Sequence, residues 1–299
     1  MHIPDYMLHG QICPITAAVS TIGLTASAYF ALKSEKKPTA LKFAAVSALV
    51  FAGQLMNFPV TNGTSGHLLG GVLASALLGT PFGVLAISIV AAIQSLLFSD
   101  GGLAVLGANI LNMAIIGAGV SGVIFDYISK KTNGKIQGYI NIVALSWVSI
   151  MLASFACSLE LAISGTIGLS KVLPAMLGVH VLIGIGEAGI TLALYLLFSL
   201  ETIADLPRWN VGLPLILSVM TALILSPFAS GFPDGLEWVA EKYRFLHESA
   251  PAFVTPLLDY SIANFSNSFI STGLAGLIGV VVTFFAGCSI GAAMRLSFK

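Results

Sequence analysis

The amino-acid sequence predicts an all-α fold, a polytopic transmembrane helical bundle of about nine spans, and three observations lead to this class. Only 9% of the 299 residues are charged and 57% are hydrophobic, whereas soluble domains carry about 25% charged residues. The apolar residues gather in repeated runs that approach the roughly 20 residues a helix needs to cross a bilayer. The Lys and Arg residues between these runs collect mostly at every second connection, an asymmetry typical of multi-pass membrane proteins.

Nine apolar segments are expected to form the spans, and they cover about 10–32, 40–60, 67–79, 81–98, 103–126, 138–162, 173–199, 211–228 and 270–294. The third and fourth segments meet at Gly79, Thr80 and Pro81. Each of them is short, so one could be a tilted or re-entrant element. The longest connection covers about 229–269, and no soluble domain fits between the spans.

The orientation follows from the positive-inside rule, which places an excess of Lys and Arg on the cytoplasmic side. With the N-terminus outside, ten of the 13 Lys and Arg residues would be cytoplasmic, and only Lys171, Lys242 and Arg244 would lie outside. The ten cytoplasmic residues would be Lys33, Lys36, Lys37, Lys42, Lys130, Lys131, Lys135, Arg208, Arg295 and Lys299. The opposite orientation would invert this distribution. An odd number of spans then places the C-terminus in the cytoplasm.

Polar side chains within the spans gather in the outer halves under this topology. Such groups are costly in hydrocarbon unless they are paired, so they tend to face the bundle interior or a polar cavity. Two interpretations stay open, because each group could join neighbouring helices or the set could line an outward-facing cavity. The one-sided distribution favours the cavity. The residues expected around it are Asp5, Asn57, Ser65, Gln94, Asn109, Asn112, Glu160, His180 and Glu187.

The N-terminus carries the most specific chemistry. In Met1-His2 the free α-amine, the His2 amide nitrogen and the His2 imidazole Nδ1 could bind one metal ion and close a five-membered and a six-membered ring. Three nitrogens would then occupy three corners of a square, a geometry typical of Ni²⁺ and Cu²⁺. Binding requires loss of the amide proton and a neutral amine, so the affinity should rise with pH. A Met-His start that arose by chance is the competing interpretation.

A second histidine could fill the fourth corner, and His67 is the first candidate. It lies at the outer start of the third segment, on the same side as Met1, within the glycine-rich stretch 63–71. Glycines there allow tight turns and close backbone approach. His9 and His247 are also expected outside and are alternatives for this position. A purely structural role of His67 is the competing interpretation.

Several motifs, in order, resemble the CbiM/NikM family, the substrate-binding (S) components of energy-coupling-factor (ECF) cobalt and nickel transporters. The start Met1-His2-Ile3-Pro4-Asp5 is similar to the family signature MHIPDG, with Tyr6 in place of the usual glycine. The later matches are Asn57-Phe58-Pro59, Gly63-Thr64-Ser65-Gly66-His67-Leu68-Leu69-Gly70-Gly71, Gln94-Ser95-Leu96-Leu97-Phe98-Ser99-Asp100-Gly101-Gly102, Leu106-Gly107-Ala108-Asn109 and His180-Val181-Leu182-Ile183-Gly184-Ile185-Gly186-Glu187. The resemblance covers about 1–200. It implies that the Met1 amine, the His2 amide and imidazole, and the His67 imidazole bind the metal.

The remainder of the chain, about 201–299, resembles a second module. The run Pro233-Asp234-Gly235-Leu236-Glu237 is similar to the PDGLE domain, a two-span module similar in role to the accessory CbiN/NikN subunit. The chain therefore resembles a fusion of a metal-binding component of about seven spans, 1–200, with a two-span hairpin, 201–299. The acidic outer loop of this hairpin, about 229–269, could be merely solvated, or it could gather or gate the metal.

The sequence offers no phosphate-binding loop for ATP, because its one Gly-Lys pair, Gly134-Lys135, is followed by Ile136. We therefore expect a transport component and not an enzyme. The resemblance implies that partners supply energy in the inner (cell) membrane of a prokaryote: an ECF transmembrane (T) component of CbiQ/NikQ type and a cytoplasmic ATPase of CbiO/NikO type. The alternative is a stand-alone secondary transporter driven by an ion gradient, with Glu187 as candidate relay.

The expected cargo is Ni²⁺ or Co²⁺, with no permanent cofactor. The sequence does not separate these two ions. The net charge of zero gives no indication of nucleic-acid binding.

Overall fold

The computed structural model describes residues 2–61, 63–132, 134–199, 209–246, 255–263 and 265–296. Across these residues the chain is mainly helical, and its strands are β1 (Phe58–Pro59) and β2 (Ser65–Gly66), which pair antiparallel. Seven of the described helices are long and apolar enough to cross a membrane. The predicted class, a helical polytopic membrane protein, is therefore confirmed. The count of nine spans and the orientation stay predictions.

The seven long helices differ in how they are wound. Four are continuous α-helices: α1 (Ile12–Lys33), α7 (Lys135–Ile163), α8 (Leu169–Phe198) and α12 (Ser268–Ala293). Three combine segments: α4 (Thr80–Ile93) with η2 (Gln94–Phe98), α5 (Leu106–Asn109) with η3 (Ile110–Val120) and α6 (Ser121–Ser129), and α10 (Trp209–Met220) with η4 (Thr221–Leu225) and η5 (Ser226–Phe228). The segments η2, η3 and η4 are π-helical, a winding that is frequent at functional sites.

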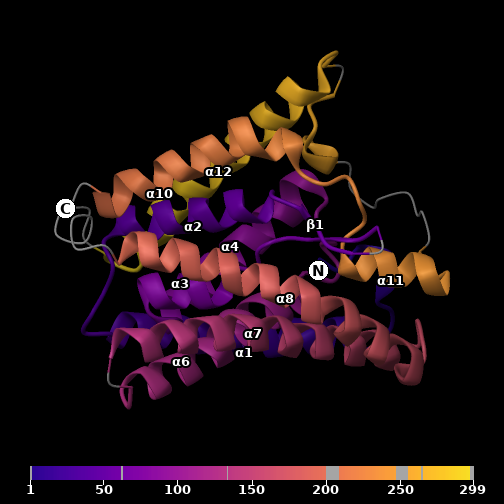
Figure 1. The fold of residues 1–299 in the computed structure, drawn as a ribbon, viewed down its shortest axis with the longest axis horizontal. Coiled ribbons are helices and arrows are strands. Elements are labelled where there is room, and N and C mark those ends of the chain that lie inside the picture. Colours follow the sequence, from indigo (N-terminus) through magenta and orange to yellow (C-terminus); the bar gives the residue numbers. More distant parts are fainter. Residues whose placement is uncertain are drawn as a thin grey trace.

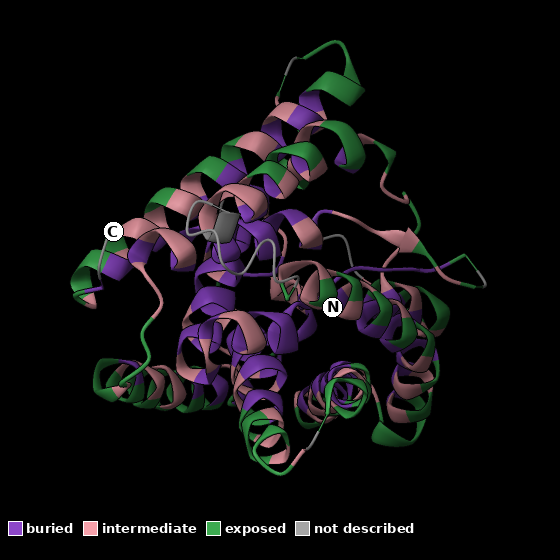
Figure 2. Ribbon diagram, turned by 60° about the vertical axis from the view of Figure 1, so that its left-hand side comes forward, coloured by how far each residue is buried: buried purple, intermediate pink, exposed green. Residues whose placement is uncertain are grey.

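The helices form a central layer that is covered on two sides (Figure 1). The middle holds α2 (Ala40–Gln54), α3 (Gly71–Leu78) and α4, while α10 and α12 cover α2 from one side and α7 runs along α8 on the other. Figure 2 shows the buried residues concentrated in this central layer and the exposed ones on the outer helices. The helix α11 (Gly235–Tyr243) lies toward one end of the bundle.

The helix α12 packs closely on α2 because glycines face the contact. A Cβ added to Gly287 would lie 2.7 Å from Cα of Ala44, and one added to Gly291 would lie 2.8 Å from Cβ of Ala40. Small residues let helices approach closely inside a membrane, where lipid tails give helices no hydrophobic reason to associate. The C-terminal module is therefore joined to the rest of the bundle through its helices as well as through the long connection 229–269.

The third expected span, 67–79, is helical over only part of its length. Its helix α3 has eight residues and rises about 12 Å, against roughly 30 Å for the hydrocarbon core. Residues 67–70 are irregular and buried, and the backbone N–H groups of Leu69 and Gly70 donate to the Glu187 carboxylate at 2.6 and 3.0 Å. Irregular backbone at membrane depth needs such partners.

The long connection 229–269 contains a helix that the sequence analysis does not predict. The side chain of Asp234 accepts hydrogen bonds from the backbone N–H groups of Leu236 and Glu237, and the Glu237 side chain accepts from the N–H of Asp234. This reciprocal capping box starts α11, and its sequence signal is an acceptor residue followed three positions later by Glu. A second short turn, η6 (Leu258–Tyr260), lies in the same connection.

Candidate metal centre

The N-terminal segment is held against the bundle where α5 ends. The Asn109 side chain bonds both backbone groups of Ile3, since Oδ1 accepts from the N–H at 2.8 Å and Nδ2 donates to the carbonyl at 3.1 Å. The Asp5 side chain accepts from the backbone N–H of Ala104 at 2.8 Å. Asn109 and Asp5, expected around a cavity, are thus placed where they position His2.

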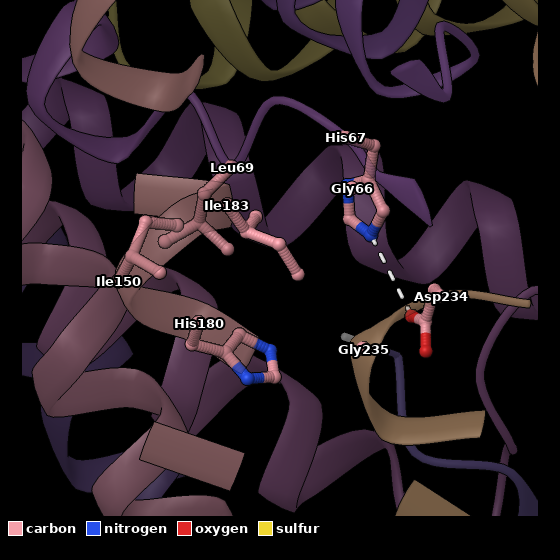
Figure 3. Close-up of a pocket in the computed structure, with 8 residues that line it drawn as sticks. All are labelled: Gly66, His67, Leu69, Ile150, His180, Ile183, Asp234 and Gly235. Atoms are coloured by element: carbon pink, nitrogen blue, oxygen red, sulfur yellow. Dashed lines mark ion pairs between the residues drawn. The ribbon is translucent and has the colours of Figure 1, made fainter. Parts of the chain in front are cut away.

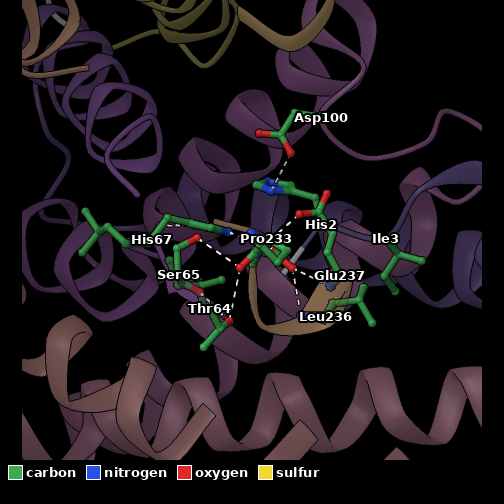
Figure 4. A network of polar contacts seen from close by, with 12 residues as sticks. His2, Ile3, Thr64, Ser65, His67, Asp100, Pro233, Leu236 and Glu237 are labelled. Atoms are coloured by element: carbon green, nitrogen blue, oxygen red, sulfur yellow. Dashed lines mark hydrogen bonds and ion pairs between the residues drawn. The ribbon is translucent and has the colours of Figure 1, made fainter. Parts of the chain in front are cut away.

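The His2 side chain is buried, with 7% of the residue exposed, and both ring nitrogens have partners. Nδ1 lies 3.0 Å from Oδ1 of Asp100 (Figure 4). Nε2 lies 3.0 Å from Oε1 of Gln94. The π-helical η2 presents Gln94, and Ser99, in the left-handed region at φ 58°, ends that turn just before Asp100. The expected chelate uses Nδ1, so metal binding would exchange the contact with Asp100 for a metal–nitrogen bond.

Asp100 brings a fixed negative charge to this place. Burial favours its neutral form, but attraction to His2 and hydrogen bonds with His2 and Tyr260 outweigh burial and hold the pKa of Asp100 below its usual range. Tyr260 donates to Oδ2 of Asp100 at 2.6 Å and accepts from Gln94 Nε2 at 3.3 Å. Burial and the Asp100 charge raise the pKa of Tyr260, so the phenol stays protonated as a donor.

His67 lies beside His2, and the two rings are nearly parallel. Their centroids are 5.2 Å apart at an interplanar angle of 16°. The His67 Nδ1 lies 3.0 Å from the carbonyl oxygen of Leu68, so this nitrogen carries the proton and Nε2 keeps the lone pair that a metal requires. Nε2 lies 3.9 Å from Oδ2 of Asp234 (Figure 3).

The two imidazoles are close enough to share one ion. A metal about 2.0 Å from a ring nitrogen lies roughly 3.2 Å from that ring's centroid, so two rings on one ion have centroids about 4.5–6.4 Å apart for bond angles of about 90–180°. The observed separation of 5.2 Å falls inside this range. Together with the His2 amide, the described residues can supply all the expected nitrogens except the Met1 amine, because Met1 lies outside the described residues.

A cavity of about 240 Å³ opens beside the two histidines. Its lining includes Asn57, as expected from the sequence, and four carboxylates: Asp100, Asp234, Glu237 and Asp259. The negative charge of Asp234 and partial burial raise the pKa of Glu237. A smaller pocket, which His67 also lines, includes His180, Asp234 and Gly235 in its lining (Figure 3). Both modules therefore surround the candidate centre.

Four residues that were expected around the cavity have other partners. Asn112 Nδ2 donates to Glu160 Oε2 at 2.7 Å, which joins η3 to α7. The Ser65 hydroxyl donates to the carbonyl of Phe232 at 2.8 Å. Glu187 binds the backbone in front of α3. These four residues follow the alternative interpretation, in which buried polar groups join elements of the bundle.

The alternative histidines do not line this cavity in the part of the chain that the structure describes. His9 is exposed, and its backbone N–H bonds the Ser164 hydroxyl, while His247 lies outside the described residues. Among the described residues, no group of three or more His, Cys, Asp or Glu side chains is arranged to hold a metal. The expected centre does not need such a group, because two of its four nitrogens would come from the Met1 amine and the His2 backbone amide, and only two from side chains.

Three residues at the centre are missing from the sequence-derived set: Asp100, Asp234 and Tyr260. Asp100 follows the fourth expected span at its outer end, in front of two glycines, and this position could have indicated it. Asp234 could have been found from the capping box that it opens. Tyr260 stands 160 residues from the Asp100 that it bonds, and no local pattern predicts that contact.

The helical membrane bundle, the paired buried histidines and the carboxylate-lined cavity define a polytopic membrane protein with a candidate metal-binding centre. Residues 2–200 match the family described as the cobalt uptake substrate-specific transmembrane region, CbiM, and residues 208–296 match the PDGLE domain. The chain belongs to this CbiM family and carries a PDGLE domain after the family region. The resemblance inferred from the motifs is confirmed.

Similar proteins include both nickel and cobalt transport proteins. A putative fused nickel transport protein NikMN of Archaeoglobus fulgidus is 32% identical over 299 residues, which cover 97% of this chain and 98% of the relative. A cobalt transport protein CbiM of Lachnoclostridium phytofermentans is 30% identical over 71% of this chain and 87% of its own length. Among solved structures, a truncated transition metal transporter superposes with a TM-score of 0.59 at 33% identity, covering 68% of this chain and 99% of that one.

Proposed function

We propose that this chain captures Ni²⁺ or Co²⁺ at the outer face of the membrane and delivers it inward as the substrate-specific component of an ECF-type uptake transporter. The observation that carries the proposal is the pair of buried, nearly parallel imidazoles of His2 and His67 beside a carboxylate-lined cavity. The four nitrogens would come from the Met1 amine, the His2 amide and Nδ1, and His67 Nε2. The names of the nickel and cobalt transport relatives support both ions.

Capture follows from the charges and contacts around the two histidines. The carboxylates of the cavity attract a hydrated divalent cation and raise its local concentration at the entrance. Asn109 holds the backbone next to His2 in place, so less ordering is needed when the chelate closes. The ion then replaces Asp100 at His2 Nδ1 and displaces the amide proton, and the affinity should rise with pH.

Delivery would depend on partners in a prokaryotic cell membrane. The proposed partners are an ECF transmembrane (T) component of CbiQ/NikQ type and a cytoplasmic ATPase of CbiO/NikO type, and membership in the CbiM family supports them. Reconstitution tests this step: vesicles that hold the chain with both partners and ATP should accumulate ⁶³Ni²⁺, and vesicles that hold the chain alone should not. Accumulation by the chain alone under an ion gradient would instead establish the secondary transporter.

The chelate is tested by metal binding to the purified chain with an authentic N-terminus. One residue added before Met1 separates the free amine from His2 and should lower Ni²⁺ and Co²⁺ affinity sharply, as should His2→Ala. His67→Ala removes a single monodentate donor, and water can replace it, so the loss should be smaller. His9→Ala is the matched control and should bind normally. Equal binding with and without the added residue, on folded protein, would refute the chelate.

A further inference from the structure

We propose that Tyr260 of the C-terminal module is a positioning residue for the metal centre, because its hydroxyl holds the Gln94 amide with the amide oxygen toward His2. That oxygen then accepts the remaining N–H of the metal-bound imidazole. This inference rests on the proposed function and gives the C-terminal module a defined role in it. Tyr260 lies within the part of the chain that matches the PDGLE domain, and it acts through Gln94 without binding the ion itself.

The expected chelate fixes which nitrogen of His2 carries a proton. Nδ1 closes the ring with the backbone amide, so the proton of the neutral, metal-bound imidazole lies on Nε2. A histidine that binds a metal almost always donates its other N–H to an acceptor, and this contact fixes the tautomer and the orientation of the ring. Nε2 of His2 lies 3.0 Å from Oε1 of Gln94. Gln94 therefore supplies the acceptor that the metal-bound ring needs.

Only one of the two orientations of the Gln94 amide fits this role. A glutamine amide can turn over in place, which exchanges its oxygen with its NH₂ group. With the NH₂ group toward His2, two donors would face each other and the metal-bound ring would lose its acceptor. Gln94 is fully buried, so the wrong orientation would leave polar groups unpaired at a cost in free energy.

The Tyr260 hydroxyl selects the orientation that fits. Its oxygen lies 2.6 Å from Oδ2 of Asp100, and an ionised carboxylate can only accept, so the phenolic proton is donated there. The same hydroxyl oxygen lies 3.3 Å from Nε2 of Gln94 and is left to accept a hydrogen bond from it. The NH₂ group of Gln94 therefore faces Tyr260, and Oε1 faces His2. Asp100 sets the direction of the hydroxyl, and the hydroxyl sets the direction of the amide.

The segment that carries Tyr260 is docked on the π-helical turn η2, which presents Gln94. The backbone N–H of Leu257 donates to the carbonyl of Leu97 at 3.0 Å. The hydroxyls of Thr255 and Ser99 lie 3.0 Å apart and form a hydrogen bond. These contacts hold the C-terminal module against the turn independently of the Tyr260 hydroxyl.

The ring and backbone of Tyr260 are also held in place. The ring stacks on Phe98, with centroids 4.5 Å apart at an interplanar angle of 21°. Asp259 and Tyr260 lie in the left-handed region, at φ 50° and 54°, which residues other than glycine rarely adopt. Such a backbone persists only where the surrounding structure holds it. Tyr260→Phe should therefore keep the ring in position and remove only the hydroxyl.

The test measures how much the effect of Tyr260→Phe depends on the amide of Gln94. Binding of Ni²⁺ and Co²⁺ to the full chain with its authentic N-terminus is measured by calorimetry, and thermal unfolding checks that each variant is folded. Tyr260→Phe is made in wild type and in two backgrounds, Gln94→Glu and Gln94→Leu. Gln94→Glu keeps an acceptor for His2 and Gln94→Leu removes it, but neither has an amide to orient. Tyr243→Phe, which removes a hydroxyl from α11 of the same module, is the matched control.

Tyr260→Phe should bind Ni²⁺ about tenfold more weakly than wild type, the lower end of the range for partners of a metal-binding histidine. Tyr243→Phe should bind as wild type does. In both Gln94 backgrounds, adding Tyr260→Phe should lower the affinity only about threefold or less, because two residues that act through one contact are not additive.

Two results would overturn the inference. The first is wild-type affinity in folded Tyr260→Phe. The second is a loss by the same factor with and without the Gln94 amide, because the hydroxyl would then act by another route. If wild type binds neither ion, the proposed function itself fails.

Discussion

Replacing Asn109 with Ala tests whether the N-terminal segment must be held on the bundle for metal to bind. The substitution removes both hydrogen bonds to Ile3, of 2.8 and 3.1 Å. The buried N–H of Ile3 then has no partner, which destabilises the docked segment by about 1–3 kcal/mol. Loss of the second hydrogen bond destabilises it by about 0.5–1.5 kcal/mol more. The Ile3 carbonyl keeps its hydrogen bond from Gly102, of 2.9 Å. Ordering each backbone residue of the segment costs about 1–2 kcal/mol. The net free energy that holds the N-terminal segment on the bundle is therefore small, and losing these hydrogen bonds should release it.

We therefore expect the Ni²⁺ affinity of Asn109→Ala to fall at least about tenfold, since each 1.4 kcal/mol is a factor of ten. Calorimetric titration on folded protein measures the affinity, and hydrogen exchange of the N-terminal peptide reports undocking. Ser20→Ala is the control, because it removes a partly buried hydrogen bond to the Gly107 carbonyl of α5 and leaves the bonds of Ile3 unchanged. Faster exchange at the N-terminus with an unchanged Ni²⁺ affinity would refute the reasoning.

Three further predictions concern the bundle. Oε1 of Glu160 and Oδ1 of Asn112 are buried and have no hydrogen-bond partner among the described residues. Glu160→Gln, which can donate from its amide, should therefore unfold at or above the wild-type temperature, while Glu160→Ala should lower the free energy of unfolding by about 1–3 kcal/mol. Equal losses in the two variants would contradict this. Gly287→Leu should separate α12 from α2, lower the unfolding temperature and reduce the free energy of unfolding by about 1–3 kcal/mol or more. Ser289→Leu, at an exposed position of the same helix, should leave the unfolding temperature unchanged. In a background without native cysteines, Thr64→Cys should react with an impermeant thiol reagent from outside and Lys36→Cys should not, and the reverse pattern would overturn the orientation.

The helical membrane class could be predicted because it depends on composition and on the length of apolar runs. The last span illustrates this, since the expected segment 270–294 and the observed α12, Ser268–Ala293, nearly coincide. The third span shows the limit. Leu68 and Leu69 extend the apolar run, so a hydrophobic window cannot separate the irregular residues 67–70 from α3. Their partner, Glu187, stands more than 100 residues away.

The candidate centre could be predicted only where a local pattern carries the chemistry. His2 is a candidate because it follows the free amine directly, and His67 because of its place in a glycine-rich motif. Asp100 and Tyr260 depend on contacts between distant segments. The intramembrane polar residues show the same limit, since apolar surroundings imply a partner for Asn112 without identifying it as Glu160. The sequence therefore indicates which polar groups are buried, but it does not tell which of them line the cavity and which join neighbouring helices.

Glu187 bonds the backbone of Leu69 and Gly70, two and three residues after His67, and its position bears on whether a cation can bind beside His67. A helix N-terminus carries the equivalent of about half a positive charge, and α3 begins four residues after His67. An uncompensated helix end at this distance would repel a divalent ion in a medium of low dielectric. The Glu187 carboxylate accepts the N–H groups of Leu69 and Gly70, which satisfies the backbone ahead of α3 and opposes the positive end of the helix. The interruption of the third span therefore lets the chain place His67 deep in the bundle, and Glu187 makes that interruption compatible with a cationic cargo.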